Sequence, residues 1–494
     1  MEKGNIKKKD IQMTKRKKGL IILFISLLGF SFATHAQTKS FKRGVGFNNM
    51  TEQEIELLSP GLSWVYNWGQ SVSNYDNFTS NGVDYIPMAW SNINLANART
   101  FLTAHPEIKY ILGFNEPNIA GQATMTPEQA ASRWADVETI ADEFNLKIVG
   151  PAVNYSATYD PYQWYTAFLD TFCVNCRVDY IALHFYLTSA SSVMNSVASF
   201  KKYGKPVWLT EFCYDKASSA KDQINFMVAT FDSLETNPDI VRYAWFMDKA
   251  SSNYNGLFAG DSLTDLGEVF TYMSSYDDNF YFTTDMQIPA TQYIRMNRVN
   301  MEKTTDESGH INLLGMNDLS WAEYNIDIPE DGEYNLFFRV SSEYAFNSNM
   351  YVLEDGNQAA SIPFNRDAGI GVWNTQSGQG MFHQGKHKIR IGFSDVGLKI
   401  NWFAITKSDS PPTTGIESPV ANDVKAYPNP VKDLLNLQVP ANTQVTLRSI
   451  CGNSVYSGKS PSSINMSAFP QGVYILDMRF ENGGRKVEKI IKEK

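Results

Sequence analysis

Residues 110–118 read Tyr-Ile-Leu-Gly-Phe-Asn-Glu-Pro-Asn, an apolar run that leads directly into Asn115 and Glu116. Residues 207–212 read Val-Trp-Leu-Thr-Glu-Phe and carry Glu211 at the end of a similar run. Continuous apolar runs of this length are typical of parallel strands that are buried on both faces. A carboxylate at the end of such a strand is costly unless it faces the open end of the sheet. The two stretches therefore predict a buried parallel sheet with acidic groups at one rim.

Six further runs of the same character flank these two, at residues 44–48, 64–68, 84–88, 147–153, 178–186 and 242–247. The eight runs follow one another at about 28 residues, which is the size of a βα unit. Eight such units predict an α/β fold, a (β/α)8 barrel over residues 40–285. One crossover helix is well marked, because Thr126 can cap it, Pro127 suits its first position and Gln129 completes a capping box.

Strands 4 and 7 of such a barrel lie across from one another, and active sites form at the C-terminal rim. We therefore expect Glu116 and Glu211 to converge over the barrel mouth. Two facing carboxylates are the minimum for cleaving a glycosidic bond, one as proton donor and the other as nucleophile or base. The alternative is that either Glu forms a structural ion pair with Lys or Arg. Their joint position at strands 4 and 7 favours catalysis.

The sequences of the predicted strands resemble those of glycoside hydrolase family 128 of clan A, the β-1,3-glucanases, over roughly residues 40–275. The matching stretches are 44–47, 64–68, 85–90, 112–118, 179–186 and 208–212. The resemblance implies a retaining endo-β-1,3-glucanase that hydrolyses laminarin-type β-glucans without a catalytic metal or cofactor. It also implies that Glu116 is the acid/base, Glu211 is the nucleophile and Asn115 binds a sugar 2-hydroxyl. Two alternatives stay open: another clan A hydrolase acting on β-1,4 or mixed linkages, and a non-catalytic surface protein that binds glycans.

Further candidates for substrate binding lie at or just beyond strand ends. His184 would orient a carboxylate or a sugar hydroxyl, and Tyr186 follows it two residues later. Trp68, Trp90 and Trp245 could stack on sugar rings, with Trp245 the preferred platform. For His184 and for each Trp, a place in the core is the alternative. His184 is the only His at a proposed strand end, so we expect no catalytic metal.

From residue 288 to 407 the pattern changes to alternation with period two. The alternating apolar residues include Tyr334, Leu336, Phe338, Val340, Ile389, Ile391 and Phe393. This pattern predicts a β-sandwich. The alternative is a structural β-sandwich that only packs against the barrel.

The sandwich region resembles a family 6 carbohydrate-binding module through residues 321–324, 331–334, 385–390 and 397–402. The resemblance implies that Glu323, Trp373 and Asn401 contact sugar and that Tyr344 forms a second aromatic wall. Met296 and Asn297 stand where such modules have a Glu, which leaves their structural calcium in doubt.

The two ends of the chain indicate export. Basic residues 15–18, an apolar run over 19–33 and the small residue Ala36 predict a signal peptide over residues 1–36. After a linker at 408–420, residues 421–494 resemble a type IX secretion sorting domain through Tyr427-Pro-Asn-Pro430 and Gly472-Val-Tyr-Ile475. We expect a secreted or cell-surface protein that passes through the periplasm, with β-glucan and the type IX machinery as partners.

Composition excludes two other classes of protein. The net charge is −9 although residues 1–36 alone carry +6, so the rest of the chain is acidic and unsuited to nucleic acid. No apolar stretch beyond the signal is long enough to predict a transmembrane helix. Cys173 and Cys176 are the only close pair among four cysteines, and an oxidising compartment favours a disulfide between them.

Overall fold

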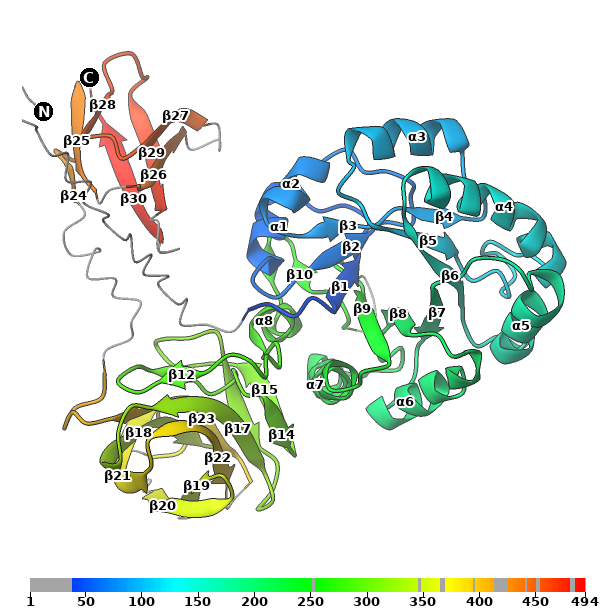
Figure 1. The fold of residues 1–494 in the computed structure, drawn as a ribbon. Helices are drawn as coiled ribbons and strands as arrows, with labels where there is room; N and C mark the ends of the chain where they lie inside the picture. The colour runs from blue at the N-terminus through cyan, green and yellow to red at the C-terminus, as the bar shows by residue number, and fades with distance from the viewer. Residues whose placement is uncertain are drawn as a thin grey trace, which may run out of the picture. The chain divides into compact units, whose positions relative to one another are not determined.

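The computed structural model describes residues 38–250, 254–344, 348–364, 369–393, 396–412, 425–439, 442–449, 454–479 and 485–493 (Figure 1). The predicted signal peptide at 1–36 and the linker residues 413–420 lie outside these ranges.

The first part of the chain forms a closed ring of parallel strands, which confirms the predicted barrel. The strands are β1 (Arg43–Gly46), β2 (Trp64–Tyr66), β3 (Asp84–Tyr85), β4 (Met88–Trp90), β5 (Tyr110–Phe114), β6 (Lys147–Val153), β7 (Tyr180–Phe185), β8 (Val207–Phe212) and β9 (Ile240–Phe246). Their order in the sheet is β3-β2-β1-β9-β8-β7-β6-β5-β4.

The third predicted strand, 84–88, is split into β3 and β4, because Pro87 lacks the N–H that a continuous ladder needs. The ring still closes across the split. Ile86 N donates to Val65 O on the β2 side (2.9 Å), and Pro87 O accepts from Leu112 N on the β5 side (2.9 Å). The nine strands therefore make one eight-membered barrel.

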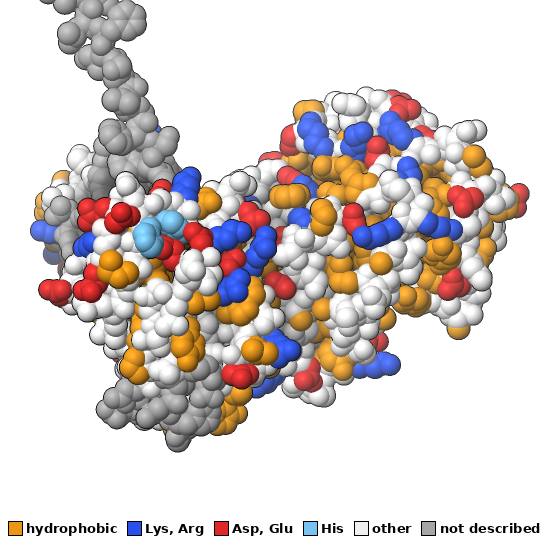
Figure 2. Space-filling view, turned by 60° about the horizontal axis from the view of Figure 1, so that its bottom comes forward, with side chains coloured by type: hydrophobic (Ala, Val, Ile, Leu, Met, Phe, Trp, Pro, Cys, Tyr) orange, Lys and Arg blue, Asp and Glu red, His pale blue; other side chains and the backbone are white. Residues whose placement is uncertain are grey.

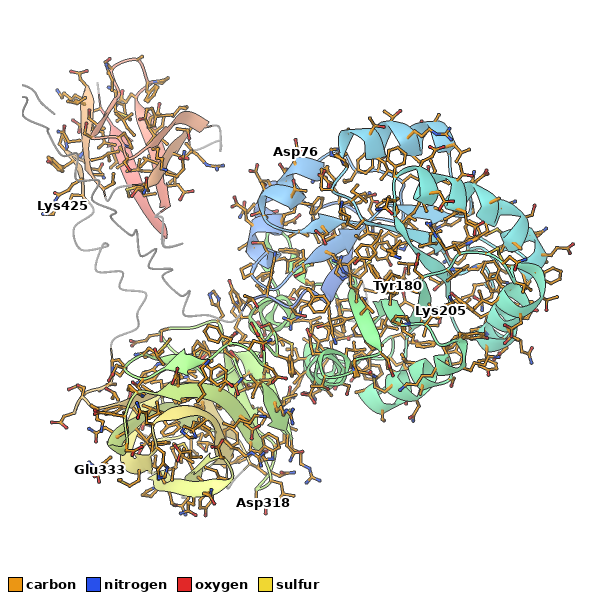
Figure 3. All side chains as sticks on the ribbon, in the orientation of Figure 1. Asp76, Tyr180, Lys205, Asp318, Glu333 and Lys425 are labelled. Carbon is orange, nitrogen blue, oxygen red and sulfur yellow. A yellow bond between two sulfur atoms is a disulfide. The ribbon has the colours of Figure 1, made fainter. Side chains whose placement is uncertain are left out.

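Helices surround the ring of strands (Figure 1). They are α1 (Glu52–Leu58), α2 (Tyr75–Ser80), α3 (Leu95–Ala104), α4 (Pro127–Glu143), α5 (Pro161–Ala167), α6 (Ala190–Ala198), α7 (Ala220–Glu235) and α8 (Asp265–Tyr272). Helix α4 begins as predicted, with a capping box between Thr126 and Gln129 and Pro127 in its first turn. Side chains fill the interior of the ring, Tyr180 of β7 among them (Figure 3).

Residues 282–406 form the predicted sandwich. Its strands are β12 (Phe282–Thr283), β13 (Ile288–Pro289), β14 (Arg295–Asn297), β15 (Val299–Lys303), β16 (Ile311–Gly315), β17 (Trp321–Ile328), β18 (Gly332–Ser342), β19 (Ser348–Glu354), β20 (Asn357–Phe364), β21 (Asn374–Phe382), β22 (Gly385–Phe393) and β23 (Leu398–Thr406). One sheet has the order β12-β17-β22-β19-β20 and the other β15-β16-β23-β18-β21. The alternating residues Tyr334, Leu336, Phe338 and Val340 of β18 are all buried.

The buried residues between the barrel sheet and its helices and those of the sandwich form one continuous apolar cluster, whereas the side chains inside the ring form a separate one. At their junction Tyr276 and Tyr293 meet edge to face with ring centroids 5.3 Å apart. Arg43 of β1 donates to the carbonyls of Phe270 (3.0 Å) and Met273 (3.2 Å). The end of the barrel and the start of the sandwich are therefore packed rather than loosely linked.

Residues 425–492 form a small β domain with a separate apolar core. Its strands are β24 (Lys425–Tyr427), β25 (Leu434–Gln438), β26 (Gln444–Ser449), β27 (Ser454–Lys459), β28 (Ser463–Asn465), β29 (Gly472–Arg479) and β30 (Arg485–Lys492), in a three-stranded and a four-stranded sheet. Among the described residues, no helix has the length and apolar character to cross a membrane.

Candidate active site

Three residues at the C-terminal rim of the barrel have a left-handed backbone. They are Trp68 (φ 58°), Trp90 (φ 54°) and Glu116 (φ 46°), which follow or end β2, β4 and β5. Non-glycine residues in this region are strained and cluster at functional sites. A backbone hydrogen bond from Glu116 N to Ala152 O of β6 (2.8 Å) stabilises the left-handed conformation of Glu116. These positions mark the rim as the place to look for chemistry.

Glu211 lies within β8 and is only 4 % exposed. Its Oε1 accepts hydrogen bonds from Tyr66 OH (2.8 Å) and Trp68 Nε1 (2.8 Å). Its Oε2 accepts from Tyr186 OH and lies 3.4 Å from His184 Nδ1. Burial and the charge of Glu211 raise the pKa of both tyrosines, so they remain protonated donors. Within the described part of the chain Glu211 has no Lys or Arg partner, so the carboxylate is held by neutral donors and one His.

Glu116 lies opposite, 6 % exposed, and shares that His. His184 Nδ1 is 2.9 Å from Glu116 Oε1, and Asn154 Nδ2 donates to the same oxygen (2.8 Å). Burial raises the pKa of Glu116, but the hydrogen bond and charge of His184 and the Asn154 bond outweigh it, so the net shift is downward. Burial lowers the pKa of His184, but the Glu211 charge and the Glu116 contact raise it overall. His184 Nδ1 therefore lies between the two carboxylates, and its pKa and that of Glu116 shift in opposite directions.

One carboxylate oxygen of Glu116, His184 Nδ1 and one of Glu211 all lie within 4.8 Å of one another. Such a group could hold a metal ion, which the sequence did not suggest because it provides a single His. His184 Nδ1 already contacts both carboxylates, and Glu211 accepts three further hydrogen bonds. That donor set suits anionic carboxylates without a metal, and the expectation of metal-free catalysis stays a prediction.

Asn115 lies directly after β5 and precedes Glu116 in the chain. Its Nδ2 donates to Gln122 Oε1 (3.1 Å), and its Oδ1 is buried with no hydrogen-bond partner among the described residues. A buried amide oxygen without a partner is costly. A hydroxyl group of a ligand would satisfy it.

The structure places the three Trp residues that were predicted to stack on sugar in two different environments. Trp68 and Trp90 are partly exposed at the rim, and Trp68 also binds Glu211. Trp245 is wholly buried, which corrects its predicted role. Its ring packs on Phe226 of α7 and its Nε1 donates to Asn255 O (2.8 Å). It therefore belongs to the core between the sheet and α7.

Phe246, the next residue of β9, lies at the rim position where Trp245 was expected. Its ring meets Trp68 (centroids 6.0 Å apart) and Tyr186 (5.4 Å) edge to face, and it is partly exposed. Tyr66 and Asn154 are the other site residues that the sequence analysis missed. Asn154 directly follows the predicted strand 147–153, which was an available signal, whereas Tyr66 lies in the middle of the predicted strand 64–68 and ends the shorter observed strand β2.

In the sandwich, two predicted sugar contacts meet on one loop. Trp373 Nε1 donates to Thr305 Oγ1 (3.0 Å), and Asn401 Nδ2 donates to Asp306 Oδ2 (2.8 Å). Tyr344 is 46 % exposed and lies just beyond β18. Whether these residues bind sugar stays a prediction.

Glu323 does not fit the predicted sugar contact. It lies on β17, 7 % exposed, and Arg390 of β22 binds it through Nε (3.1 Å) and Nη2 (2.8 Å). The Arg390 guanidinium also lies 3.9 Å above the Trp321 ring. The carboxylate is therefore engaged in a structural ion pair. Met296 and Asn297, where calcium was in doubt, lie on β14.

Cys173 and Cys176 are joined by a disulfide, with Cα atoms 5.0 Å apart. The bond closes the loop that follows the π-helical turn at Phe168–Phe172, remote from the two carboxylates in the chain.

Three family models match the chain. Residues 44–270 match the glycosyl hydrolase catalytic core, residues 289–407 the carbohydrate binding module (family 6), and residues 425–493 the secretion system C-terminal sorting domain. With the paired glutamates at the barrel mouth, these matches define the protein as a glycoside hydrolase with a carbohydrate-binding module and a sorting tail.

Two solved structures narrow the class. The chain is 36 % identical to a GH128 (subgroup II) endo-beta-1,3-glucanase of Sorangium cellulosum, over 47 % of this chain and 98 % of that one, with a TM-score of 0.44. It is 33 % identical to the corresponding enzyme of Pseudomonas viridiflava, over 48 % and 98 %, with a TM-score of 0.45. By sequence identity over nearly the whole of these relatives, and not by the TM-scores, the catalytic region belongs to glycoside hydrolase family 128.

Curated relatives share only parts of the chain. Alkali-sensitive linkage protein 1 of Schizosaccharomyces pombe is 25 % identical over 247 residues, and the clotting factor G alpha subunit of Tachypleus tridentatus is 30 % identical over 122 residues. The matches span 44 % and 18 % of those proteins and 47 % and 24 % of this chain.

Proposed function

We propose that the protein is a secreted retaining endo-β-1,3-glucanase that hydrolyses laminarin-type β-glucans. The single observation that carries the proposal is the close approach of Glu116 and Glu211, with one oxygen of each within 4.8 Å of the other. Retaining glycosidases have carboxyl groups roughly 5–5.5 Å apart, whereas inverting enzymes leave about 6.5–9.5 Å for a water molecule. The β-1,3 linkage follows the activity that the Sorangium and Pseudomonas relatives are named for.

In the first step Glu211 attacks the anomeric carbon while Glu116 gives a proton to the leaving oxygen, so the glycosidic bond breaks as the glycosyl-enzyme bond forms. In the second step Glu116 takes a proton from water, whose oxygen displaces Glu211 and releases the sugar. The hydrogen bonds from Tyr66, Trp68 and Tyr186 orient Glu211 for attack. The unpartnered Oδ1 of Asn115 is suited to accept a hydrogen bond from a sugar hydroxyl.

The general acid must be protonated when the substrate is bound, yet His184 lowers the pKa of Glu116 in the free protein. The contact of 2.9 Å between His184 Nδ1 and Glu116 Oε1 resolves this, because the proton can shift across it. Attack by Glu211 removes the negative charge that holds the proton on His184. His184 is therefore proposed as the group that stores the acid proton.

The appended domains support action on an insoluble or large glucan outside the cell. The module that matches family 6 would hold the enzyme on the polysaccharide, which raises its local concentration at the chain. The tail would direct export by type IX secretion after passage through the periplasm, with the tail either removed or attached at the surface.

The test is hydrolysis of laminarin by the chain from Gln37 onward. The wild type should release reducing sugar as a series of oligosaccharides, and Glu211→Gln should release none. Glu128→Gln, on the exposed face of α4, is the matched control and should keep full activity. Proton NMR of the first product should show the β-anomer. Cellulose or mixed-linkage glucan as the only substrate would overturn the linkage, and no activity on any glucan would overturn the proposal.

A further inference from the structure

One buried side chain, Asn118, fastens the loop after β6 to the segment that carries Glu116. Asn118 is 4 % exposed and lies two residues after Glu116. The chain turns at this point, because Ile119 N donates to Glu116 O (3.0 Å). The backbone that holds Glu116 therefore also sets the position of the Asn118 side chain.

The Asn118 amide group binds the backbone of the loop between β6 and α5 through three hydrogen bonds. Its Nδ2 donates to Asn154 O (2.6 Å) and to Tyr159 O (3.0 Å), and its Oδ1 accepts from Asn154 N (3.3 Å). A side chain that donates two hydrogen bonds and accepts one on adjacent atoms must be an amide in this orientation. We call these three bonds the Asn118 clamp. It holds Asn154 by both of its backbone groups and connects the two ends of the loop.

Asn154, which the clamp holds, directs its own amide group at Glu116. Its Oδ1 accepts from Tyr155 N (2.7 Å), so its Nδ2 faces away from that N–H and donates to Glu116 Oε1 (2.8 Å). An exchange of the two amide atoms would set N–H against N–H and oxygen against oxygen. Asn118, Asn154 and Glu116 therefore form a continuous chain of contacts across two loops of the rim.

Glu116 lies among four other titratable groups of the barrel mouth. His184 of β7 contacts its Oε1 at 2.9 Å, and one Glu211 oxygen of β8 lies within 4.8 Å of a Glu116 oxygen. The phenols of Tyr66 on β2 and Tyr186 after β7 are the remaining two, and the charge of Glu116 contributes to their raised pKa values after burial and the charge of Glu211.

The hydrogen bond from Asn154 acts on the ionised form of Glu116. Burial raises the pKa of Glu116, whereas His184 and Asn154 lower it. On the face of the molecule shown in Figure 2, positive and negative side chains are interspersed. Salt screens such surface charges over about 10 Å. The contacts inside the barrel mouth, rather than that surface, therefore set the protonation of Glu116.

We propose that Asn118 is a positioning residue for the acid/base, which acts through Asn154 to hold Glu116 in one orientation at the barrel mouth. The inference rests on the proposed function, in which Glu116 first gives a proton and then takes one. A group with both tasks must keep its place through both steps, and a displacement of about 1 Å can cost about 100-fold in rate. Side chains that fix a reacting group from behind maintain such geometry.

The kinetic test compares Asn154→Ala, Asn118→Ala and the double variant in the chain from Gln37. Each single variant should move the basic limb of kcat/KM on laminarin to higher pH, because Glu116 loses a donor to its ionised form. Its kcat should fall by about 10- to 100-fold with little change in KM, since the clamp does not contact sugar. The double variant should shift no further than Asn154→Ala, because Asn118 acts through Asn154.

A titration that needs no activity separates this inference from the proposed function. The ¹³C shift of the Glu116 carboxyl, assigned with Glu116→Gln, should show a raised pKa in Asn154→Ala and in Asn118→Ala. A wild type that is inactive on every glucan would refute the glucanase, and the titration would still decide whether the clamp acts on Glu116. Asn118→Ser, which retains one donor, should give a smaller shift in the same direction if Asn118→Ala is too unstable to measure.

Asn74→Ala is the matched control. Asn74 Nδ2 donates to Met50 O (3.1 Å), so this Asn also fastens one rim loop to another, but it belongs to no chain of contacts that ends at a carboxylate. It should lower the thermal midpoint and leave both the basic limb and the titration of Glu116 unchanged. An unchanged titration in the Asn154 and Asn118 variants would overturn the proposal. So would an effect of Asn118→Ala that is as large in the Asn154→Ala background as in wild type.

Discussion

His184 contacts two carboxylates at once, and we propose that this single residue controls which group holds the acid proton. Burial lowers the pKa of His184, but Glu211 and Glu116 raise it overall, whereas His184 lowers the pKa of Glu116. Productive attack needs one proton on the His184–Glu116 pair and none on Glu211. A proton that can bind at either His184 or Glu116 dissociates at a higher pH than a proton that can bind at only one of them. The basic limb of the pH–rate profile should therefore report the pair.

We predict that His184→Asn moves the basic limb of kcat/KM to lower pH, because Glu116 alone must then hold the proton. The check is the pH dependence of laminarin hydrolysis by wild type and variant. A merely structural role would lower kcat/KM at every pH without moving the limb. An unchanged limb would thus contradict the role proposed for His184.

A second prediction at this scale concerns metal. His184 Nδ1 and the two carboxylates are already linked by contacts of 2.9 and 3.4 Å, so catalysis should need no ion. Dialysis against EDTA should leave the rate on soluble laminarin unchanged, measured as reducing sugar released. Loss of activity that added Zn²⁺ restores would show instead that Glu116, His184 and Glu211 form a metal site.

At the scale of the element, β9 shows that neighbouring residues of one strand have opposite environments. Ala244 points into the ring, Trp245 lies in the outer core against α7, and Phe246 reaches the rim. Side chains of a strand alternate between faces, so a shift of one residue exchanges core for site.

Trp245→Ala and Phe246→Ala should consequently separate stability from activity. Trp245→Ala should destabilise the fold by about 3–5 kcal/mol, the usual loss for a buried Trp, while keeping kcat at low temperature. Phe246→Ala loses ring contacts worth about 0.5–1.5 kcal/mol each at the mouth, so kcat/KM should fall roughly 2- to 10-fold. Chemical unfolding and laminarin kinetics measure the two effects. The reverse pattern would contradict the assignment of the two faces.

The same strand shows what the sequence could predict. Continuous apolar runs located every barrel strand, and the capping residues located the start of α4, because both depend on local chemistry. A strand buried on both faces has no polar alternation, so its sequence does not reveal which residue faces inward, and Trp245 was placed wrongly. Glu116 and Glu211 were found because a carboxylate after an apolar run is costly anywhere except the rim. The ion pair of Glu323 could not be predicted from the sequence, because Arg390 lies 67 residues away and contacts Glu323 only through sheet pairing.

At the scale of the whole molecule, the sandwich should matter only when the substrate is a solid. Trp373→Ala removes a partly exposed ring without touching the barrel. We predict weaker binding to insoluble β-1,3-glucan and slower hydrolysis of it, with unchanged kcat/KM on soluble laminarin, because tethering acts through local concentration. Sedimentation of the protein with the polysaccharide measures the binding. Unchanged sedimentation would remove Trp373 from the proposed sugar contacts.

The cores of the molecule predict how it unfolds. Barrel and sandwich share one apolar cluster, joined by Tyr276 with Tyr293 and by the buried contact of Ser274 Oγ with Tyr293 O, whereas the tail has a separate core. A shared core makes its two halves unfold together, because neither can open without exposing the other. Calorimetry of the chain from Gln37 should therefore show one large transition for barrel and sandwich and a smaller one for the tail. Truncation after Pro412 should remove only the smaller transition. Two large transitions in the truncated chain would mean that the junction at Tyr293 contributes no cooperativity.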